Sequence, residues 1–234
     1  CRFCNVRKGT PQAPDDTEPS RIAAFVKSTG AGYVVITSVT RDDLEDLGTG
    51  HFERTVRAVR EEAPHARIEL LIPDMAGRPD LVKKMAFSGA SVIGHNVEMP
   101  ESLYGKVRPG SSYRDSVRTL SLLASAKRSG ADILVKSSIM AGLGENADDI
   151  CLTMRELAGA GVDIFFAGQY LRPSPAHFPV KKFYAPGEFA LLRDKALRAG
   201  FRHVEAGPMV RSSYRAEQAY RACLGQERPV PEGA

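Results

Sequence analysis

The sequence predicts an α/β fold built on a parallel sheet that is covered by helices. Two observations carry this prediction along the 234-residue chain. Short β-branched runs that are apolar on both faces recur, which is typical of strands in a parallel sheet. Each run is followed by an amphipathic stretch of helical length, which favours a βα repeat. The pattern fits a barrel, a partial barrel or a doubly wound sheet in a single domain.

The expected strands and helices alternate along the chain, and glycines mark the ends of most of the helices. Five strands are expected at residues 33–37, 68–72, 91–94, 132–136 and 163–167, and a sixth is expected at 202–206. Helices are expected at residues 18–28, 51–62, 80–88, 113–129, 147–160 and 187–199. Glycines that favour helix ends close five of these helices: Gly30, Gly89, Gly130, Gly161 and Gly200.

Composition narrows the class of protein. The 32 basic and 28 acidic residues give a net charge of +4, and these charges are spread along the chain without the basic runs typical of nucleic-acid or membrane binding. No apolar run is long enough to cross a bilayer. The four cysteines are too few and too unevenly placed for a disulfide framework, which predicts a reducing cytoplasm. A mild basic excess suits an acidic protein partner.

Polar residues follow the expected strands, where the chemistry of parallel βα folds collects. Asn96 and Glu98 would share one face after their strand and could hold an amino acid's ammonium and carboxylate, or a ribose. Lys136 could meet a carboxylate, and a phosphate-binding turn is a competing interpretation. The string alone favours a plain tight turn with Glu145 capping the next helix. His95 is interpreted as a structural residue. The polar strings are T-S-V-T-R-D-D-L, P-D-M, H-N-V-E-M, K-S-S-I-M-A-G-L-G-E and G-Q-Y-L-R-P-S.

The chain opens with C-R-F-C, which places Cys1 and Cys4 where both thiolates could reach one metal or cluster. A half zinc site, a thioredoxin-like redox pair or two unrelated thiols are the alternatives. No second C-x-x-C or pair of histidines follows, which disfavours zinc. The spacing alone supports a cluster site, a redox pair and a chance pair of cysteines about equally.

Taken together, the motifs resemble those of lipoyl synthases in order and spacing along nearly the whole chain. They are C-R-F-C-N-V, Y-V-V-I-T-S-V-T-R-D-D-L, I-E-L-L-I-P-D, H-N-V-E, Y-G-K-V-R-P-G, M-A-G-L-G-E, G-Q-Y-L-R-P-S and G-P-M-V-R-S-S-Y. The resemblance implies a partial parallel (β/α)6 barrel of the radical S-adenosylmethionine (SAM) type over residues 1–206, whose first strand would precede Cys1. Residues 207–234 would form a C-terminal extension that carries R-S-S-Y.

The resemblance also implies two 4Fe-4S clusters and SAM as cofactors. C-R-F-C matches the last two cysteines of the family's C-x-x-x-C-x-x-C motif, so Cys1 and Cys4 inherit the role of ligands to the radical SAM cluster. The first cysteine of that motif and a three-cysteine motif for an auxiliary cluster would lie before Cys1. In R-S-S-Y, Ser213 is favoured over Ser212 as the serine ligand of the auxiliary cluster. The candidates for the SAM pocket are Thr37, Ser38, Asn96, Glu98 and Lys136.

The implied activity is sulfur insertion at carbons six and eight of a protein-bound octanoyl-lysine. The expected partners are octanoylated lipoyl domains or the glycine cleavage H protein, with ferredoxin or flavodoxin as electron donor and with no nucleic acid or membrane. With one cluster cysteine outside it, the chain as written is expected to hold no stable cluster and to be inactive. Two alternatives stay open: a radical enzyme of the biotin synthase type, and a cluster-free barrel protein that kept the scaffold.

Overall fold

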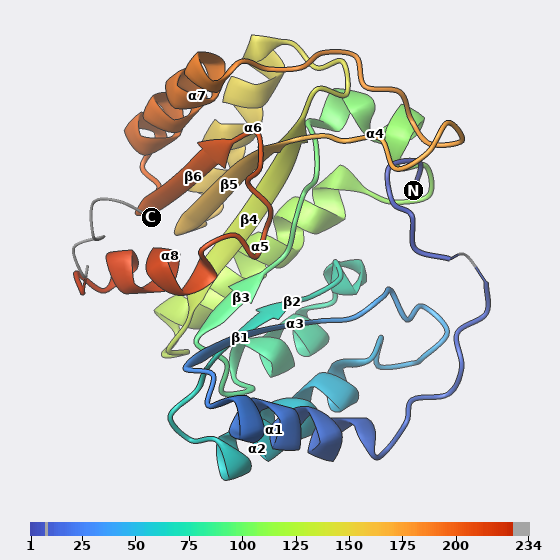
Figure 1. The fold of residues 1–234 in the computed structure, drawn as a ribbon, viewed down its shortest axis with the longest axis vertical. Coiled ribbons are helices and arrows are strands. Elements are labelled where there is room, and N and C mark those ends of the chain that lie inside the picture. The colour runs from blue at the N-terminus through green and yellow to red at the C-terminus, as the bar shows by residue number, and fades with distance from the viewer. Residues whose placement is uncertain (8, 227–234) are drawn as a thin grey trace.

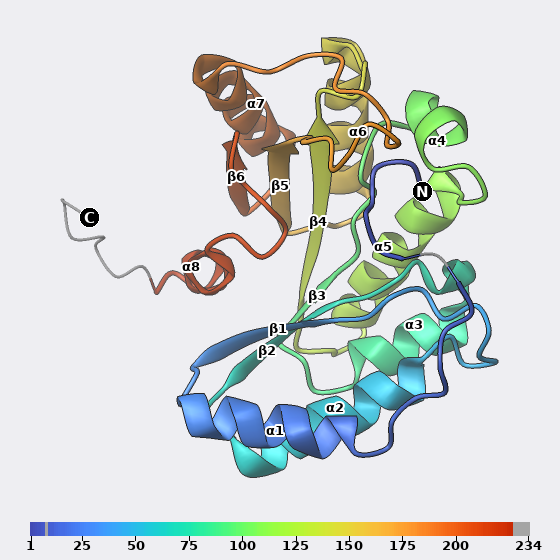
Figure 2. The same ribbon diagram turned by 45° about the vertical axis from the view of Figure 1, so that its right-hand side comes forward.

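The computed structural model describes residues 1–7 and 9–226 and contains one six-stranded parallel sheet (Figures 1 and 2). The strands lie in chain order, so each strand pairs with its neighbours in the sequence. The sheet curves strongly between its edges, β1 and β6, and forms a partial barrel (Figure 2). The predicted α/β fold class is therefore confirmed.

All six expected strands and all six expected helices are present. The strands are β1 (Tyr33–Thr37), β2 (Arg67–Leu71), β3 (Val92–Gly94), β4 (Leu134–Ala141), β5 (Ile164–Gln169) and β6 (His203–Gly207). The expected helices are α1 (Glu18–Thr29), α2 (Thr49–Glu62), α3 (Pro79–Ala86), α5 (Tyr113–Arg128), α6 (Ala147–Gly159) and α7 (Pro186–Ala199). The sequence did not predict α4 (Glu101–Val107), α8 (Ala216–Cys223) or the short 3-10 helix η1 (Met75–Gly77).

One strand boundary was predicted wrongly. Strand β4 was expected at residues 132–136, with the polar string that starts at Lys136 after it, but it spans Leu134–Ala141. Ser137 and Ser138 are buried, and the Ser137 hydroxyl accepts a hydrogen bond from Val97 N at 3.4 Å. Because these hydroxyls are covered and extended backbone pairing with β5 is maintained, Lys136 lies within the strand and not at its end.

The core has two parts, one on each face of the curved sheet. The outer face packs against the surrounding helices, with Ile68 and Leu70 of β2 and Phe165 of β5 among its fully buried residues. On the inner face, helix α8 covers the concave side of the sheet (Figure 2). The inner cluster consists of Val92, Leu134, Ile164, Phe166, Val210, Ala219 and Cys223.

The segment that links β6 to α8 crosses the end of β5. A Cβ atom on Gly168 would lie 2.1 Å from Val210 O, so only glycine allows the two backbones to approach this closely. The R-S-S-Y motif belongs to this segment, which therefore packs on the inner face of the barrel. Of the expected extension 207–234, residues 227–234 lie outside the described residues. Within the described part of the chain, no helix is both long and apolar enough to cross a membrane.

Candidate functional site

The C-R-F-C loop lies at the mouth of the barrel, beside α4 and the segment that follows β5 (Figure 1). Three hydrogen bonds fasten it there. Arg2 N donates to Val107 O at 2.8 Å, and Phe178 N donates to Arg2 O at 2.7 Å. His177 Nε2 lies 3.2 Å from Cys4 O and must be the donor, because a carbonyl oxygen only accepts. The loop is thus held between two elements that are distant in sequence.

Both thiols of this loop line one cavity of about 290 Å³, which we call the thiol cavity. Val6 N donates to Cys4 Sγ at 3.5 Å, and an amide donor of this kind suits a sulfur that carries negative charge. Two cysteines that line one cavity fit two ligands of an iron–sulfur cluster. Among the described residues, no three His, Cys, Asp or Glu side chains gather to hold a metal ion. The lining residues are Cys1, Phe3, Cys4, Val6, Thr37, Ser38, Val39, Thr40, Leu71, Ile72, Pro73, His95, Asn96, Glu98 and Arg108.

Four of the five predicted SAM-pocket residues line the thiol cavity: Thr37, Ser38, Asn96 and Glu98. Thr37 ends β1, and its hydroxyl donates to Leu71 O at 3.0 Å. The Ser38 hydroxyl donates to Val39 O at 2.9 Å. Because each hydroxyl has used its donor on the backbone, both present acceptor lone pairs to the cavity.

Glu98 occupies a special backbone position after β3. Its φ of 69° is uncommon for a residue with a side chain. Two hydrogen bonds to β4 hold it there, because Glu98 N donates to Ser138 O at 3.1 Å and Met140 N donates to Glu98 O at 2.8 Å. Burial raises the pKa of Glu98 to about 7, while the charge of Arg108 and a hydrogen bond with Asn96 act in the opposite direction.

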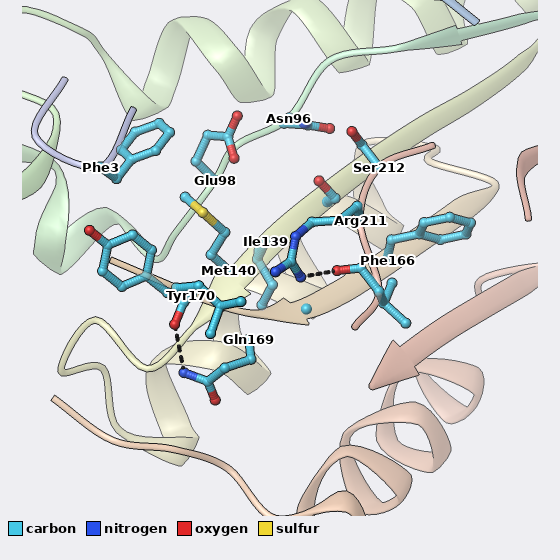
Figure 3. A pocket seen from close by; sticks show the side chains of 14 residues that line it. Phe3, Asn96, Glu98, Ile139, Met140, Phe166, Gln169, Tyr170, Arg211 and Ser212 are labelled. Atoms are coloured by element: carbon cyan, nitrogen blue, oxygen red, sulfur yellow. Dashed lines mark hydrogen bonds between the residues drawn. The ribbon is translucent and has the colours of Figure 1, made fainter. Parts of the chain in front are cut away.

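A second cavity of about 260 Å³ adjoins the first and extends over the ends of β4 and β5 (Figure 3). We call it the inner cavity. Phe3, Asn96 and Glu98 line both cavities and therefore lie between them. The remaining lining residues are Ser138, Ile139, Met140, Phe166, Gly168, Gln169, Tyr170, Leu171, Val210, Arg211 and Ser212.

Lys136 lines neither cavity, in contrast to its expected place in the SAM pocket. It lies within strand β4, where it is buried. Lys136 Nζ is 2.6 Å from Glu69 Oε1, and the two side chains are only 2% and 3% exposed. Tyr33 OH donates to the other oxygen of Glu69 at 2.6 Å, and the ammonium lies 4.4 Å from the centre of the Phe166 ring. Burial lowers the pKa of Lys136, while the Glu69 carboxylate opposes this shift. The described lining of the two cavities does not include Lys136.

The serines of R-S-S-Y occupy different environments. Ser212 lines the inner cavity, where its side chain lies near Asn96 (Figure 3). Ser213, the predicted cluster ligand, is exposed. The preceding Arg211 donates to Val210 O at 2.6 Å, the same carbonyl that lies close to Gly168 of β5.

The M-A-G-L-G-E turn is closed by its acidic residue. The Glu145 carboxylate accepts from Gly142 N at 2.6 Å and from Leu143 N at 2.9 Å. Asn146 and Asp149 form the capping box of α6, so the interpretation of Glu145 as the helix cap is wrong. Glu145 fixes the turn itself.

The sequence does not predict two residues of the site. His177, which belongs to none of the motifs, contacts the carbonyl of Cys4. Arg108 belongs to Y-G-K-V-R-P-G, a motif to which the sequence assigns no role, and it lines the thiol cavity. Neither residue directly follows a strand, where polar residues predict a site in this fold. His95 is buried, and its Nδ1 lies 2.9 Å from Ile72 O, whereas its Nε2 has no hydrogen-bond partner among the described residues.

Known proteins share both the sequence and the fold. The model of the Radical SAM superfamily matches residues 1–157. A lipoyl synthase of Bacillus cereus (strain G9842) is 46% identical over 222 residues, which cover 95% of this chain and 74% of that relative. This chain belongs to the lipoyl synthase family. The superfamily uses a 4Fe-4S cluster together with SAM, and membership decides against the biotin synthase type.

Other lipoyl synthases match the chain at similar identity, and the chain spans little more than half of their length. The mitochondrial lipoyl synthase of Vitis vinifera is 45% identical over 94% of this chain, which spans 56% of that protein. The lipoyl synthase of Xylella fastidiosa (strain M23) is 43% identical over 100% of this chain and 63% of its own length.

Solved structures share the fold at low sequence identity. Methylornithine synthase (PylB) gives a TM-score of 0.62 at 20% identity, covering 87% of this chain and 66% of that protein. Streptococcus suis SuiB bound to SAM gives a TM-score of 0.64 at 13% identity, covering 88% and 47% of the two chains.

Proposed function

We propose that this chain is the catalytic barrel of a lipoyl synthase, which inserts sulfur at carbons six and eight of a protein-bound octanoyl-lysine. The observation that carries the proposal is that Cys1 and Cys4 line the same cavity as Asn96 and Glu98. The four residues come from the N-terminal loop and from the end of β3, at the mouth of the barrel where βα folds place their chemistry. The family membership supplies the reaction class.

The residues of the thiol cavity would hold the cofactors. Cys1 and Cys4 would provide two thiolate ligands to the radical SAM cluster, and Asn96 and Glu98 offer donor and acceptor groups for SAM. When bound, the cluster supplies the electron that converts SAM to methionine and the deoxyadenosyl radical that removes hydrogen. Phe3, which lines both cavities, would separate the cluster from the substrate.

The inner cavity is suited to the octanoyl chain. Part of its lining is apolar and would contact a saturated chain: Ile139, Met140, Phe166, Tyr170 and Leu171. Polar side chains, among them Asn96, Gln169 and Arg211, complete the lining. The apolar part would hold the reacting carbons near the junction of the cavities, which a radical reaction requires.

An auxiliary 4Fe-4S cluster would supply the sulfur atoms, with a serine oxygen of R-S-S-Y among its ligands. Ser213 remains the proposed ligand, because it is exposed and therefore open to a cluster carried by another part of the protein. An oxygen ligand is harder than a thiolate and holds iron less well. Ser213→Cys should keep SAM cleavage but reduce sulfur insertion, whereas Ser212→Ala should have the smaller effect. A larger loss of auxiliary cluster in Ser212→Ala would transfer the role to Ser212.

The proposed partners follow from the reaction. An octanoylated lipoyl domain or the glycine cleavage H protein would be the acceptor, and ferredoxin or flavodoxin would donate the electron. We assign the reaction to the cytoplasm, while the plant relative is named as mitochondrial.

The test is a turnover experiment with the protein expressed from its natural reading frame and reconstituted anaerobically with iron and sulfide. An octanoylated lipoyl domain, SAM and a reductant are added, and deoxyadenosine and the lipoylated product are measured by mass spectrometry. Cys4→Ala should abolish both products. Cys151→Ala is the matched control, because Cys151 belongs to α6 and lines neither the thiol nor the inner cavity. Deoxyadenosine without any sulfur-containing product would refute lipoyl synthesis and leave a different radical SAM reaction.

A further inference from the structure

Inner-face side chains of β4 and β5 form successive levels along the barrel, because the two parallel strands pair in register. Side chains two residues apart on a strand point to the same face. Toward the mouth, the levels are Lys136 with Ile164, Ser138 with Phe166, and Met140 with Gly168. The second and third levels line the inner cavity, whereas neither residue of the first belongs to its described lining. Along these two strands, the cavity therefore ends at the level of Ser138 and Phe166.

Phe166 supplies the larger part of that end. Ser138 is a small residue, whereas Phe166 carries an aromatic ring and is 0% exposed. The ring packs in the inner cluster, together with Leu134 and Ile164, which are 5% and 1% exposed. An interior packed in this way resists displacement of a side chain into it. The ring therefore has no space into which it could retreat from a longer ligand.

The two neighbouring strands fix the Phe166 ring in this position. Lys136 Nζ of β4 lies 4.4 Å from the centre of the ring, a distance at which an aromatic ring attracts a cation. The ammonium is itself held by Glu69 Oε1 at 2.6 Å. On β6, the His203 ring lies 6.5 Å from the Phe166 ring. Phe166 is thus a rigid end to the cavity.

The length of a carrier-bound acyl chain matters only at the inner end of such a cavity. The first carbon of the chain is bound to a lysine of a carrier protein, which is too large to enter, so the methyl end lies innermost. Carbons six and eight must stay at the reacting groups. Extra carbons would therefore extend beyond carbon eight toward the inner end, where an aromatic ring leaves them no room.

We propose that Phe166 closes the inner end of the inner cavity and thereby sets the length of the acyl chain that the protein accepts. The proposal rests on the proposed function, because it takes the octanoyl chain as the occupant of this cavity. It adds a residue that determines substrate specificity and that lies apart from the thiol cavity.

The test compares two acyl lengths on one carrier, so that the contacts of the carrier itself cancel. A lipoyl domain that bears octanoyl-lysine or decanoyl-lysine is added to the protein expressed from its natural reading frame and reconstituted anaerobically. Isothermal titration calorimetry measures binding without reductant, and mass spectrometry measures sulfur insertion with SAM and reductant. The unaltered protein should prefer octanoyl to decanoyl by about 10- to 200-fold, the range for a methylene that an apolar pocket does not fit.

Phe166→Val should reduce this preference about 10-fold or more in both measurements, because it opens the inner end of the cavity. Phe166→Leu leaves less new space and should reduce the preference by a smaller factor, and it decides the question if melting followed by circular dichroism shows that Phe166→Val does not fold. Phe165→Val is the matched control. Phe165 is also 0% exposed but belongs to the outer core, where it stacks on Phe201 at 4.9 Å, and its replacement should leave the preference within about twofold.

Three results would overturn the role of Phe166 and leave the proposed function intact. They are equal acceptance of both chains by the unaltered protein, an unchanged preference in the folded Phe166 variants, and an equal shift in Phe165→Val. Failure of the unaltered protein to bind or convert the octanoylated domain would instead overturn the proposed function, and this role of Phe166 with it.

Discussion

Replacing Lys136 by methionine would test whether this residue stabilises the barrel interior by pairing with Glu69. The change leaves the Glu69 carboxylate, 3% exposed, without its cation and with one hydrogen bond from Tyr33. Breaking a buried pair in this way typically costs about 3–5 kcal/mol. The carboxylate can instead take up a proton, which for an ordinary glutamic acid costs about 4 kcal/mol at pH 7 but only about 1 kcal/mol at pH 5. The smaller cost determines the loss of stability.

The expected loss is therefore about 3–4 kcal/mol at pH 7 and about 1 kcal/mol at pH 5. The loss grows with pH because the folded variant must keep a proton on Glu69 that the unfolded chain releases. Urea unfolding followed by circular dichroism measures it. With a slope of about 3 kcal/mol/M, the midpoint should fall by roughly 1 M at pH 7 and by about a third of that at pH 5.

Two controls separate this effect from lost packing. Adding Glu69→Gln to Lys136→Met removes the uncompensated charge. The double variant should therefore regain most of the lost stability, and the dependence of the loss on pH should disappear. Lys182→Met breaks a pair of the same 2.6 Å length whose side chains are 50% and 40% exposed, and it should cost less than about 1 kcal/mol. A pH-independent loss in Lys136→Met, or a loss below about 1 kcal/mol at pH 7, would refute the reasoning.

Three further predictions concern the site. His177→Ala removes the donor to Cys4 O, and amide exchange in the cysteine loop should speed up about 10-fold; unchanged exchange would show that the loop holds without it. The pKa of Glu98 is about 7 in the folded protein against an ordinary 4.5, so the protein loses stability as pH rises through this interval. Glu98→Gln should therefore unfold at a higher urea concentration than the natural protein at pH 8, and at the same concentration at pH 4. Gly168→Ala places a methyl group against Val210 O and should lower stability by about 1–3 kcal/mol, and a melting temperature equal to that of the natural protein would contradict the close approach.

The strands and long helices could be predicted because their signals are local. Apolar β-branched runs bounded by helix-ending glycines identify six strands and six helices without reference to packing. Helix α4 has only seven residues, and α8 has eight, of which only Ala216, Ala219 and Cys223 are buried. These helices depend on the surfaces that they cover, and such surfaces are not visible in a short stretch of sequence.

The same distinction separates the site residues that were predicted from those that were missed. Thr37 ends a strand, and Asn96 and Glu98 follow one closely, so the rule that parallel strands share an active edge places them correctly. Arg108 lines the thiol cavity from the end of a short helix, and His177 contacts the cysteine loop from a long connection. Their positions depend on hydrogen bonds to the cysteine loop and to its neighbours, which no spacing in the sequence encodes.

Lys136 shows that the depth of a residue in the barrel decides its role as much as the face it occupies. Side chains two residues apart on a strand point to the same face and lie about 6–7 Å apart along it. Ser138 and Met140 line the inner cavity, and Lys136 lies one such step deeper on the same face, where Glu69 neutralises it. Alternation along β4 therefore places Lys136 on the inner face correctly. Its depth depends on where the strand ends, and that end is set by the burial of Ser137 and Ser138, which a polar string in the sequence conceals.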